Sequence, residues 1–469
     1  AMATAHLASW SCNLTYSQLP RNVIDAAIRT FYNWAGCAVG GSNHLTTTTA
    51  LNALEPFFGQ PAASLLGAGD RLVDAQHAAL LNGIASHVHD YDDTHLDTII
   101  HPAGPVASAL LAVAEWKVGA SGKDILLALV CGIEAECKLG LAVWPEHYDI
   151  GWHITSSAGS IGAAVAVSKL LSLSVEQTSH GIGIASTQVT GLREMFGSDT
   201  KAFHTGRAAQ SGLLAAVLAQ QGYTSSGQAL EAKRGWANVV GATKEDVQVN
   251  LNKWLGLDTE DLQEQSDVGL AGGLSSGRWE ILRNSFKPYP CGIVIHPVID
   301  GCCQLHSEIK RLGLSSTNIQ QVQVTVHPLV VELTGKTAPK DGLEGKFSFY
   351  HGGAIGLLYG KATPDEYEDH IVQDPTVVAI RGRIQGTIDP KLRPDEAKIV
   401  LTMNDGSVLE RHVEHAVGSL NAPMDDEALE KKFKNQCAKV LADVDLASQT
   451  CWNIEEIKHI PELGWALSL

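Results

Sequence analysis

A helical pattern that runs from the N-terminus to about residue 240 constrains the fold of this chain more than any other feature. Alanine and leucine dominate it, and apolar residues recur at steps of three and four, as they do on the buried face of a helix. The segment Asp124–Val130 leads one such helix, and Ser174–Gln177 has the form of a capping box that opens another. The small residues of Ser157–Ala164 allow close helix packing. The pattern predicts a large helical domain with a well-buried centre.

The composition and periodicity of the sequence change after residue 240. Residues 243–268 are more acidic and polar, and the glycine-rich run Gly269–Gly277 follows as a plausible junction. Gln321–Val326 alternates as a strand should, and Lys398–Val413 is typical of a hairpin with Asp-Gly in its turn. The segment from Cys291 to about residue 312 is again helical in pattern.

These changes predict a mainly α fold, with a large all-helical domain and a smaller α+β lid domain. We expect the helical domain to span residues 1–268 and the lid domain residues 269–415. Residues 416–469 would form C-terminal helices that return to the helical domain, beginning with a helix from Asp425 to Val440.

Composition excludes several classes of function. The 469 residues are too many for one ordinary core, and the net charge of −17 disfavours nucleic acid and anionic membranes as partners. An anionic substrate must therefore be held by a local cluster of cations. The nine cysteines include no Cys-x-x-Cys pair, which favours reduced, buried thiols and a cytoplasmic location, with the mitochondrial matrix as an alternative. Neither a secretory signal nor a membrane span is predicted.

The run from His87 to His95 is the leading site candidate, because it holds three histidines and three aspartates within nine positions. Imidazole and carboxylate groups side by side can move protons near neutral pH. Asp90 and Thr94 are four apart, so on a helix or its final turn they would share one face. His101 follows after a short loop and is fixed by Pro102. The alternative is a helix C-terminus decorated with polar caps.

The same run offers atoms for a metal. His87 and His89, with Asp90 and Asp92, are suitable ligands. A His-x-His pair points both imidazoles one way only on a strand, however, and this segment is predicted to be helical. No second cluster completes a coordination sphere. The sequence therefore predicts no metal, with a metal-dependent hydrolase as an open alternative.

Further candidates are cationic. His153 precedes the small-residue helix and could help to hold an anion at its N-terminus, although a buried structural histidine is the alternative. Lys201, His204 and Arg207 fall at three-residue steps on one helix face and form a plausible carboxylate anchor, or else a surface charge cluster. Lys287 precedes a rigid Pro-Tyr-Pro segment that would position its ammonium group, or it is an ordinary loop lysine.

Two familiar motifs give only weak or no evidence of function in this chain. Gly273–Gly277 matches Gly-x-Ser-x-Gly, but no strand precedes it, as a nucleophile elbow requires. The chain has no complete Gly-x-Gly-x-x-Gly and no P-loop, so a nucleotide cofactor is not expected.

Taken together, four motifs resemble the MmgE/PrpD family, and they match in order over most of the chain. They are His87–His95 with His101-Pro102, Gly151–His153, Phe196–Ala209 and Lys287–Cys291. The known activities of this family are dehydration of 2-methylcitrate, decarboxylation of cis-aconitate and epimerisation of iminodisuccinate.

The resemblance implies a homodimer without metal or organic cofactor, and a site between the two domains. It carries over Asp90, Thr94, His101, His153, Lys201 and Lys287 as site residues. Two departures stand out. The spacing from Thr94 to His101 is about one residue longer than in the animal decarboxylases, and Ser348–His351 replaces the usual small-residue run near a site aromatic, here Tyr350.

The expected function is that of a cofactor-independent lyase acting on a citrate-like polycarboxylate, by proton transfer next to a carboxylate. We expect catalytic roles for His101, Asp90 and Lys201. The predicted substrate-binding residues are Thr94, His153, His204, Lys287 and Tyr350. Dehydration is favoured over decarboxylation because it needs only one acid–base group plus cations. An epimerase of a dicarboxylate and a non-catalytic ligand-binding homologue remain as alternatives.

Overall fold

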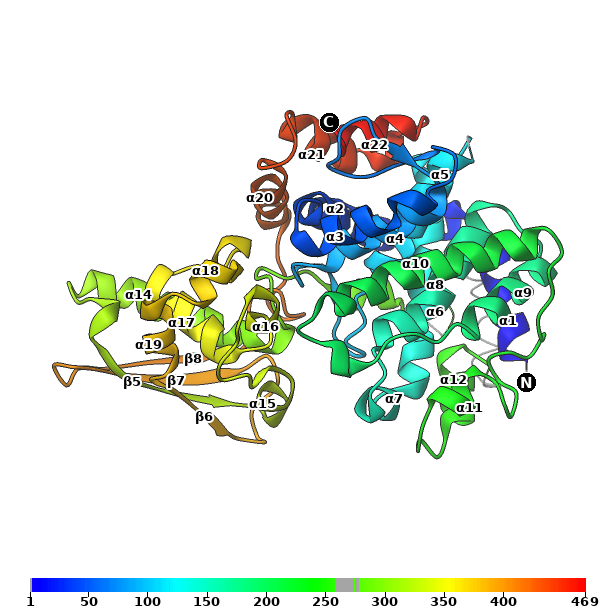
Figure 1. Ribbon diagram of the computed structural model, residues 1–469. Helices are drawn as coiled ribbons and strands as arrows, with labels where there is room; N and C mark the ends of the chain where they lie inside the picture. The colour runs from blue at the N-terminus through cyan, green and yellow to red at the C-terminus, as the bar shows by residue number, and fades with distance from the viewer. Residues whose placement is uncertain (1, 118, 258–273, 275–277) are drawn as a thin grey trace.

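The computed structural model describes residues 2–117, 119–257, 274 and 278–469. The chain forms a large helical domain beside a smaller α+β domain (Figure 1), which confirms the predicted mainly α class. The helices of the large domain are α1 (Ala3–Asn13), α2 (Arg21–Gly41), α3 (Leu45–Leu54), α4 (Ala75–His87), α5 (Ala103–Trp116), α6 (Gly122–Val143), α7 (Glu146–Ile150), α8 (Ile154–Leu170), α9 (Val175–Ser186), α10 (Asp199–Gln220), α11 (Trp236–Val240) and α12 (Val247–Trp254).

Helix α8 lies at the centre of this domain. Every residue from Ile154 to Ser168 is buried, and α5, α6, α9 and α10 pack around the helix. A helix that is apolar on all sides must be enclosed in this way. His153 is the N-cap residue of α8, so the central helix fixes its position deep in the domain.

Helices α4 and α10 approach each other through glycines. A Cβ atom built on Gly83 of α4 would lie 2.6 Å from the Cα atom of Gly206 of α10. One built on Gly206 would lie 2.2 Å from the carbonyl oxygen of Leu80. Only glycine permits so close an approach. The contact places the first turn of α10, which carries Lys201, beside the end of α4.

The smaller domain is a four-stranded sheet with helices on one face (Figure 1). Its strand order is β6 (Ile384–Ile388), β5 (Ile319–Val326), β7 (Ala397–Met403) and β8 (Val408–Val413), with β5 and β6 parallel and the other pairs antiparallel. Its helices are α14 (His296–Arg311), α15 (Pro328–Thr334), α16 (Gly342–Gly345), α17 (Phe349–Tyr359), α18 (Asp369–Val372) and α19 (Pro375–Arg381). The predicted strand, hairpin and helix of this domain are all confirmed.

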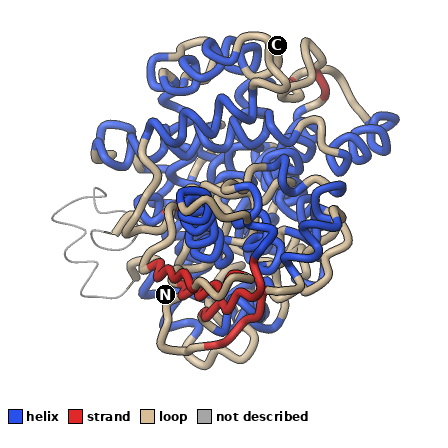
Figure 2. The backbone as a smooth tube through the Cα atoms, turned by 90° about the vertical axis from the view of Figure 1, so that its left-hand side faces the viewer, coloured by secondary structure: helices blue, strands red, loops and turns tan. Residues whose placement is uncertain are grey.

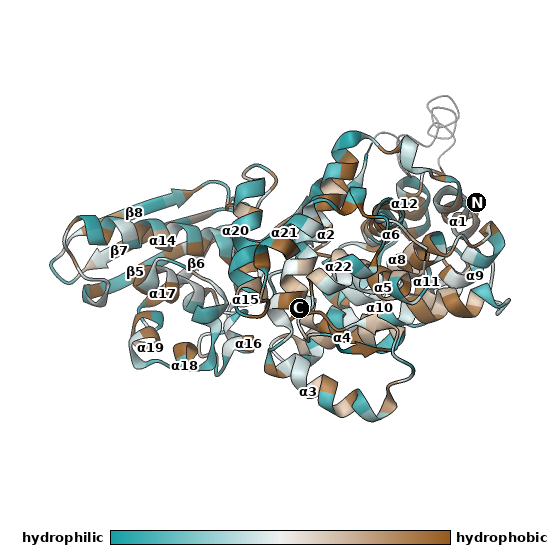
Figure 3. Ribbon diagram, turned by 90° about the horizontal axis from the view of Figure 1, so that it is seen from above, coloured by the Kyte–Doolittle hydropathy of each residue, from teal (hydrophilic) through white to brown (hydrophobic). Residues whose placement is uncertain are grey.

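The sheet is amphipathic. Val322, Val324 and Val326 of β5 are fully buried against the helices, whereas the residues between them are at least partly exposed. The edge strand β8 is at least partly exposed along all but its last residue. It carries a hydrophilic stretch, Glu410–His412 (Figure 3), as suits an unpaired sheet edge. These strands lie together in one part of the molecule (Figure 2). Two short pairs lie outside this sheet: β1 (Ala63–Ser64) with β2 (Leu72–Val73), and Thr94–His95 with Asn284–Ser285.

The chain returns to the helical domain after β8. Helices α20 (Asp426–Cys437), α21 (Val444–Trp452) and α22 (Pro461–Ala466) lie on the helical domain (Figure 1). The ring of Phe433 stacks on Tyr32 of α2 at 4.5 Å between centres. The Lys432 ammonium group donates to Asn33 Oδ1 and to the carbonyl oxygen of Tyr91.

One expectation about local structure is wrong. The segment after His87 is not helical: α4 ends at His87, Asp90 has a left-handed φ of 49°, and Thr94–His95 form a short strand, β3. This strand pairs with β4 (Asn284–Ser285). Asp90 and Thr94 therefore do not share a helix face. The physical reason is long-range: Lys287 and Lys346 donate to the carbonyl oxygens of Asp90 and His89, and the Tyr91 hydroxyl donates to that of Pro288.

Some expectations fall outside the described residues. They are the glycine-rich junction, apart from Leu274, the Gly-x-Ser-x-Gly match and the domain boundary at 268. All nine cysteines are described; none is in a disulfide, and seven are buried. Within the described ranges, no helix combines the length and the apolar character needed to cross a membrane.

Candidate active site

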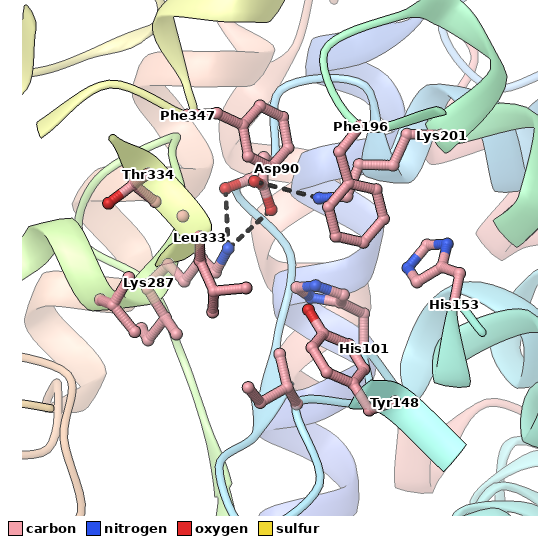
Figure 4. A pocket seen from close by; sticks show the side chains of 14 residues that line it. Asp90, His101, Tyr148, His153, Phe196, Lys201, Lys287, Leu333, Thr334 and Phe347 are labelled. Carbon is pink, nitrogen blue, oxygen red and sulfur yellow. Dashed lines mark hydrogen bonds and ion pairs between the residues drawn. The ribbon is translucent and has the colours of Figure 1, made fainter. Parts of the chain in front are cut away.

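A small cavity lies at the seam between the two domains (Figure 4). Asp90, His101, Tyr148, His153, Phe196 and Lys201 line it from the helical domain, and Lys287, Ile293, Leu333, Thr334 and Phe347 line it from the other side. Its volume is about 40 Å³. A buried water needs about 10–15 Å³, so the cavity holds only a few waters in this closed arrangement.

Two lysines grip one carboxylate in this cavity (Figure 4). Lys201 Nζ donates to Asp90 Oδ2 at 3.2 Å, and Lys287 Nζ donates to Asp90 Oδ1 at 2.7 Å. Burial alone raises the pKa of Asp90, but the two ammonium groups hold it well below its usual range. Two ammonium groups and one carboxylate leave a net charge of +1 in a site from which water is largely excluded. Such a site attracts an anion.

The backbone around Asp90 is held by lysines as well. Lys287 Nζ also donates to the carbonyl oxygens of Asp90 and Cys291. Lys346, from the turn between α16 and α17, donates to the carbonyl oxygens of His89 and Pro290, both at 2.9 Å. Together with the β3–β4 pairing, these bonds bring Lys287 to Asp90.

His101 is a neutral imidazole in this structure. Its Nδ1 lies 2.9 Å from the carbonyl oxygen of Asp93, which can only accept. Nδ1 therefore carries the ring hydrogen, and Nε2 carries a lone pair. Burial lowers the pKa of His101 to about 3, although Asp92 opposes the shift. The ring faces the cavity beside the two lysines, as the predicted site requires (Figure 4).

His153 also lines the cavity, and it bonds to His204. Their Nδ1 atoms are 2.9 Å apart, so one ring must donate and the other accept. Burial lowers the pKa of His153 well below its usual value and that of His204 to about 4. His204 is buried but does not line the cavity. The third predicted cation of this face, Arg207, bonds to Gln210 instead and is also absent from the lining.

Two further predicted substrate-binding residues, besides His204, lie outside the cavity lining. Thr94 is fully buried, with Oγ1 3.3 Å from His101 Nδ1, so its position suits holding the His101 ring rather than binding a ligand. Tyr350 lies in the lid domain, where its ring stacks on Phe349 at 4.0 Å. The α17 helix directs Tyr350 into the packing of the lid.

Three aromatic residues of the site were not singled out from the sequence. The Lys201 ammonium lies 4.9 Å from the ring centre of Phe196 and 4.8 Å from that of Phe347. Both rings present a π-face that stabilises the cation. Tyr148 lies beside His101 with its hydroxyl directed into the cavity (Figure 4). Its only signal in the sequence is a position three residues before Gly151-Trp152-His153.

Four residues in and beside the cavity have the geometry of a metal site. His87, Asp90, Asp92 and His101 are buried, and their donor atoms lie within 4.8 Å of one another. Asp90 is already bound by two ammonium groups, however, and these would repel a divalent cation. His89, which the sequence offered as a ligand, bonds through Nε2 to the carbonyl oxygen of Gly40. The donor set does not suit a divalent metal.

The fold and site define a two-domain protein with a buried, positively charged acid–base cavity at the domain seam. The chain belongs to the MmgE/PrpD family. The model of the MmgE/PrpD N-terminal domain matches residues 5–248, and that of the MmgE/PrpD C-terminal domain matches residues 289–454.

Three relatives illustrate the likeness. A cis-aconitate decarboxylase-like protein of Aspergillus oryzae is 26% identical over 93% of this chain and 91% of its own length. The human cis-aconitate decarboxylase is 26% identical over 85% of this chain and 80% of its own length. The mitochondrial 2-methylcitrate dehydratase of Yarrowia lipolytica is 24% identical over 83% of this chain and 75% of its own length.

Proposed function

We propose that this protein is a lyase that acts on a citrate-like polycarboxylate by proton transfer next to a carboxylate, without a cofactor. One observation carries the proposal. The buried Lys201–Asp90–Lys287 set, with its net positive charge, lies in one cavity with a neutral imidazole, His101, whose Nδ1 is bonded to the carbonyl oxygen of Asp93. The names of the relatives, which describe decarboxylation of cis-aconitate and dehydration of 2-methylcitrate, support the same class.

The proposed mechanism uses these groups in turn. A substrate carboxylate replaces Asp90 as the partner of Lys201 and Lys287, and the two ammonium groups stabilise the charge that builds beside it. His101 Nε2 accepts or returns the proton at the neighbouring carbon. Asp90 balances the lysine charge before the substrate arrives. His153 hydrogen-bonds to the substrate, whereas Thr94 fixes the His101 ring.

Admission of substrate requires the cavity to widen. The present volume of about 40 Å³ accommodates only a few waters, so a polycarboxylate must displace Asp90 or part the two domains. Once bound, it excludes the remaining water, and this strengthens every charge interaction around it.

Among the possible reactions, dehydration of a 2-methylcitrate-type substrate is favoured, followed by decarboxylation of a cis-aconitate-type substrate. Epimerisation of a dicarboxylate requires an acid–base group on each face of the carbon. A non-catalytic homologue would bind such acids without converting them.

A proton NMR screen of polycarboxylates in D₂O tests the proposal, because it reports alkene formation, CO₂ loss and α-proton exchange together. We expect turnover of at least one citrate-like acid and none by His101→Ala. His370→Ala, which alters an exposed lid histidine, is the matched control and keeps full activity. A fully active His101→Ala variant overturns the role of His101. Calorimetric binding of citrate without any reaction supports the non-catalytic homologue instead.

The assembly proposed for this protein is a homodimer. The partly to well exposed apolar residues Leu218, Tyr223 and Val239 line a surface groove of the helical domain, and a second copy would cover it. Light scattering should give twice the chain mass, and Val239→Asp should reduce the measured mass.

The proposed location is the cytoplasm, or alternatively the mitochondrial matrix, where the thiols of this chain stay reduced.

A further inference from the structure

We propose that His87, held by Asp92, is a second proton-transfer residue of this site and works together with His101. The proposal rests on the proposed function and names a second acid–base group for that same reaction.

The orientation of His87 is fixed by one neighbour. His87 Nδ1 lies 3.0 Å and 2.9 Å from the two carboxylate oxygens of Asp92. Burial raises the pKa of Asp92, but His87 and His101 lower it to about 2, so the carboxylate is ionised. A carboxylate can only accept, so His87 Nδ1 carries a hydrogen. The opposite nitrogen, Nε2, is the one left for chemistry.

That nitrogen has no hydrogen-bond partner among the described residues, although the residue is only 2% exposed. A buried polar atom without a partner costs about 1–3 kcal/mol, and native structures hold few of them. His89, two residues along the chain, differs in this respect because its Nε2 reaches the carbonyl oxygen of Gly40. The unpartnered Nε2 of His87 is the kind of atom that a ligand or substrate satisfies.

The position of His87 brings it to the reacting groups. Its ring centre lies 4.8 Å from that of His101 and 6.2 Å from that of His153. His87 lines a second small cavity, which shares Asp90, Lys201 and Phe347 with the main one. The two imidazoles thus approach the Lys–Asp–Lys set from adjoining cavities. One ring nitrogen each of His87 and His101 lies within 4.8 Å of an Asp90 oxygen, so a substrate carboxylate that displaces Asp90 would lie close to both rings.

The chemistry balances with these two groups alone. The proposed step starts with a hydrogen on each ring nitrogen of His87, and the Nδ1 hydrogen is donated to Asp92. In dehydration, His101 Nε2 takes the proton as the C–H bond breaks, and the electron pair forms the C=C bond. The C–O bond breaks on the neighbouring carbon, and His87 Nε2–H protonates the departing hydroxyl, which leaves as water. His101 has then gained one proton and His87 has lost one, and transfer between the neighbouring rings restores both.

The test compares His87→Gln with His89→Gln. Glutamine keeps a hydrogen-bonding amide but cannot transfer a proton at neutral pH. We expect His87→Gln to lower kcat by about 10²-fold or more with KM roughly unchanged, while His89→Gln keeps near-normal kcat. In D₂O, His87→Gln should still exchange the α-proton of the substrate through His101 without losing the hydroxyl. Normal kcat in a folded His87→Gln overturns the proposal.

A second measurement uses the wild-type protein, so it does not depend on whether His87→Gln folds. It also separates the role of His87 from the proposed reaction. The wild-type protein, labelled with ¹⁵N-histidine, is titrated with tricarballylate, a citrate analogue that lacks the hydroxyl. We expect the Nε2 resonance of His87 to shift and that of His89 to stay. If His87 shifts but no polycarboxylate is converted, the reaction is wrong while His87 still lies in the ligand site. If wild type turns over and His87 does not respond, the role of His87 is overturned alone.

Discussion

Lys287 Nζ lies 2.7 Å from Asp90 Oδ1, although the two residues are 197 positions apart in the chain. Asp90 follows a helix of the large domain, and Lys287 lies in the segment that leads into the small one. The ion pair therefore forms only when the two parts of the chain are docked. It ties the charge of the site to the assembly of the domain seam.

Replacement of Lys287 should weaken the binding of an anionic substrate. Among the described residues, Lys287→Met leaves Asp90 with Lys201 as its remaining ion-pair partner, so the net charge of the set falls from +1 to zero. We expect kcat/KM to fall by about 10²–10³-fold, as when one charge-stabilising donor is removed from an active site. Steady-state kinetics check this. Lys310→Met, on the exposed face of α14, is the control and should match wild type; equal loss in both variants would contradict the assignment.

Two tyrosines should behave differently. Tyr148 lines the cavity, whereas Tyr350 packs on Phe349 within the lid. Loss of one hydrogen bond to a bound substrate costs about 1 kcal/mol, so Tyr148→Phe should lower kcat/KM by roughly fivefold. Tyr350→Phe should leave it unchanged. The reverse order of effects would show that the ligand binds further into the lid than the cavity indicates.

The glycine contact between α4 and α10 should limit stability. In Gly206→Ala the new Cβ would lie 2.2 Å from the carbonyl oxygen of Leu80, so the helices must move apart. We expect a loss of about 1–3 kcal/mol in the free energy of unfolding and a lower Tm. Gly227→Ala is the control, because its Cβ would meet nothing within 4 Å. Denaturant unfolding of both variants measures the difference, and equal Tm values would show that the contact can relax freely.

Asp93 should make stability depend on pH in a specific direction. Burial, together with the neighbouring Asp92 carboxylate, raises the pKa of Asp93 from 3.8 to about 7. Between these values the native state holds a proton that the unfolded chain has released, so the stabilisation from this group is lost as pH rises toward 7.

Asp93→Asn removes that dependence. The free energy of unfolding of wild type, minus that of Asp93→Asn, should therefore decline between about pH 4 and 7 and level off above it. Urea unfolding of both proteins across this range gives the difference. A constant difference would mean that Asp93 is ionised in the folded protein throughout.

Much of the architecture followed from local patterns. The helical periodicity, the capping box at Ser174 and the Asp-Gly hairpin at Asp405 all depend on residues close in sequence. The placement of Lys201 and His204 on one helix also followed from spacing, since α10 is regular there. Such signals survive because neighbouring residues satisfy them without help from the rest of the chain.

Only some features of the site were predicted from the sequence. His101, Asp90, Lys201, Lys287 and His153 meet in one cavity as expected. The expected helix face shared by Asp90 and Thr94 does not exist, because Asp90 adopts a left-handed conformation that contacts from residues 287 and 346 hold in place. Tyr148, Phe196 and Phe347 were not predicted as site residues, although Phe196 opens one of the motifs, since an aromatic residue in a sequence does not reveal which cavity its ring faces.

The sequence by itself determined the helical body, the α+β lid and the identity of the charged groups, because periodicity, turn residues and side-chain chemistry are local properties. Only the tertiary structure decided that Lys201 and Lys287 would share one carboxylate, and that the Nδ1 hydrogen of His101 would point at a backbone carbonyl. Charge in a protein interior acts through distance and burial, and neither quantity exists until segments far apart in the chain pack against each other.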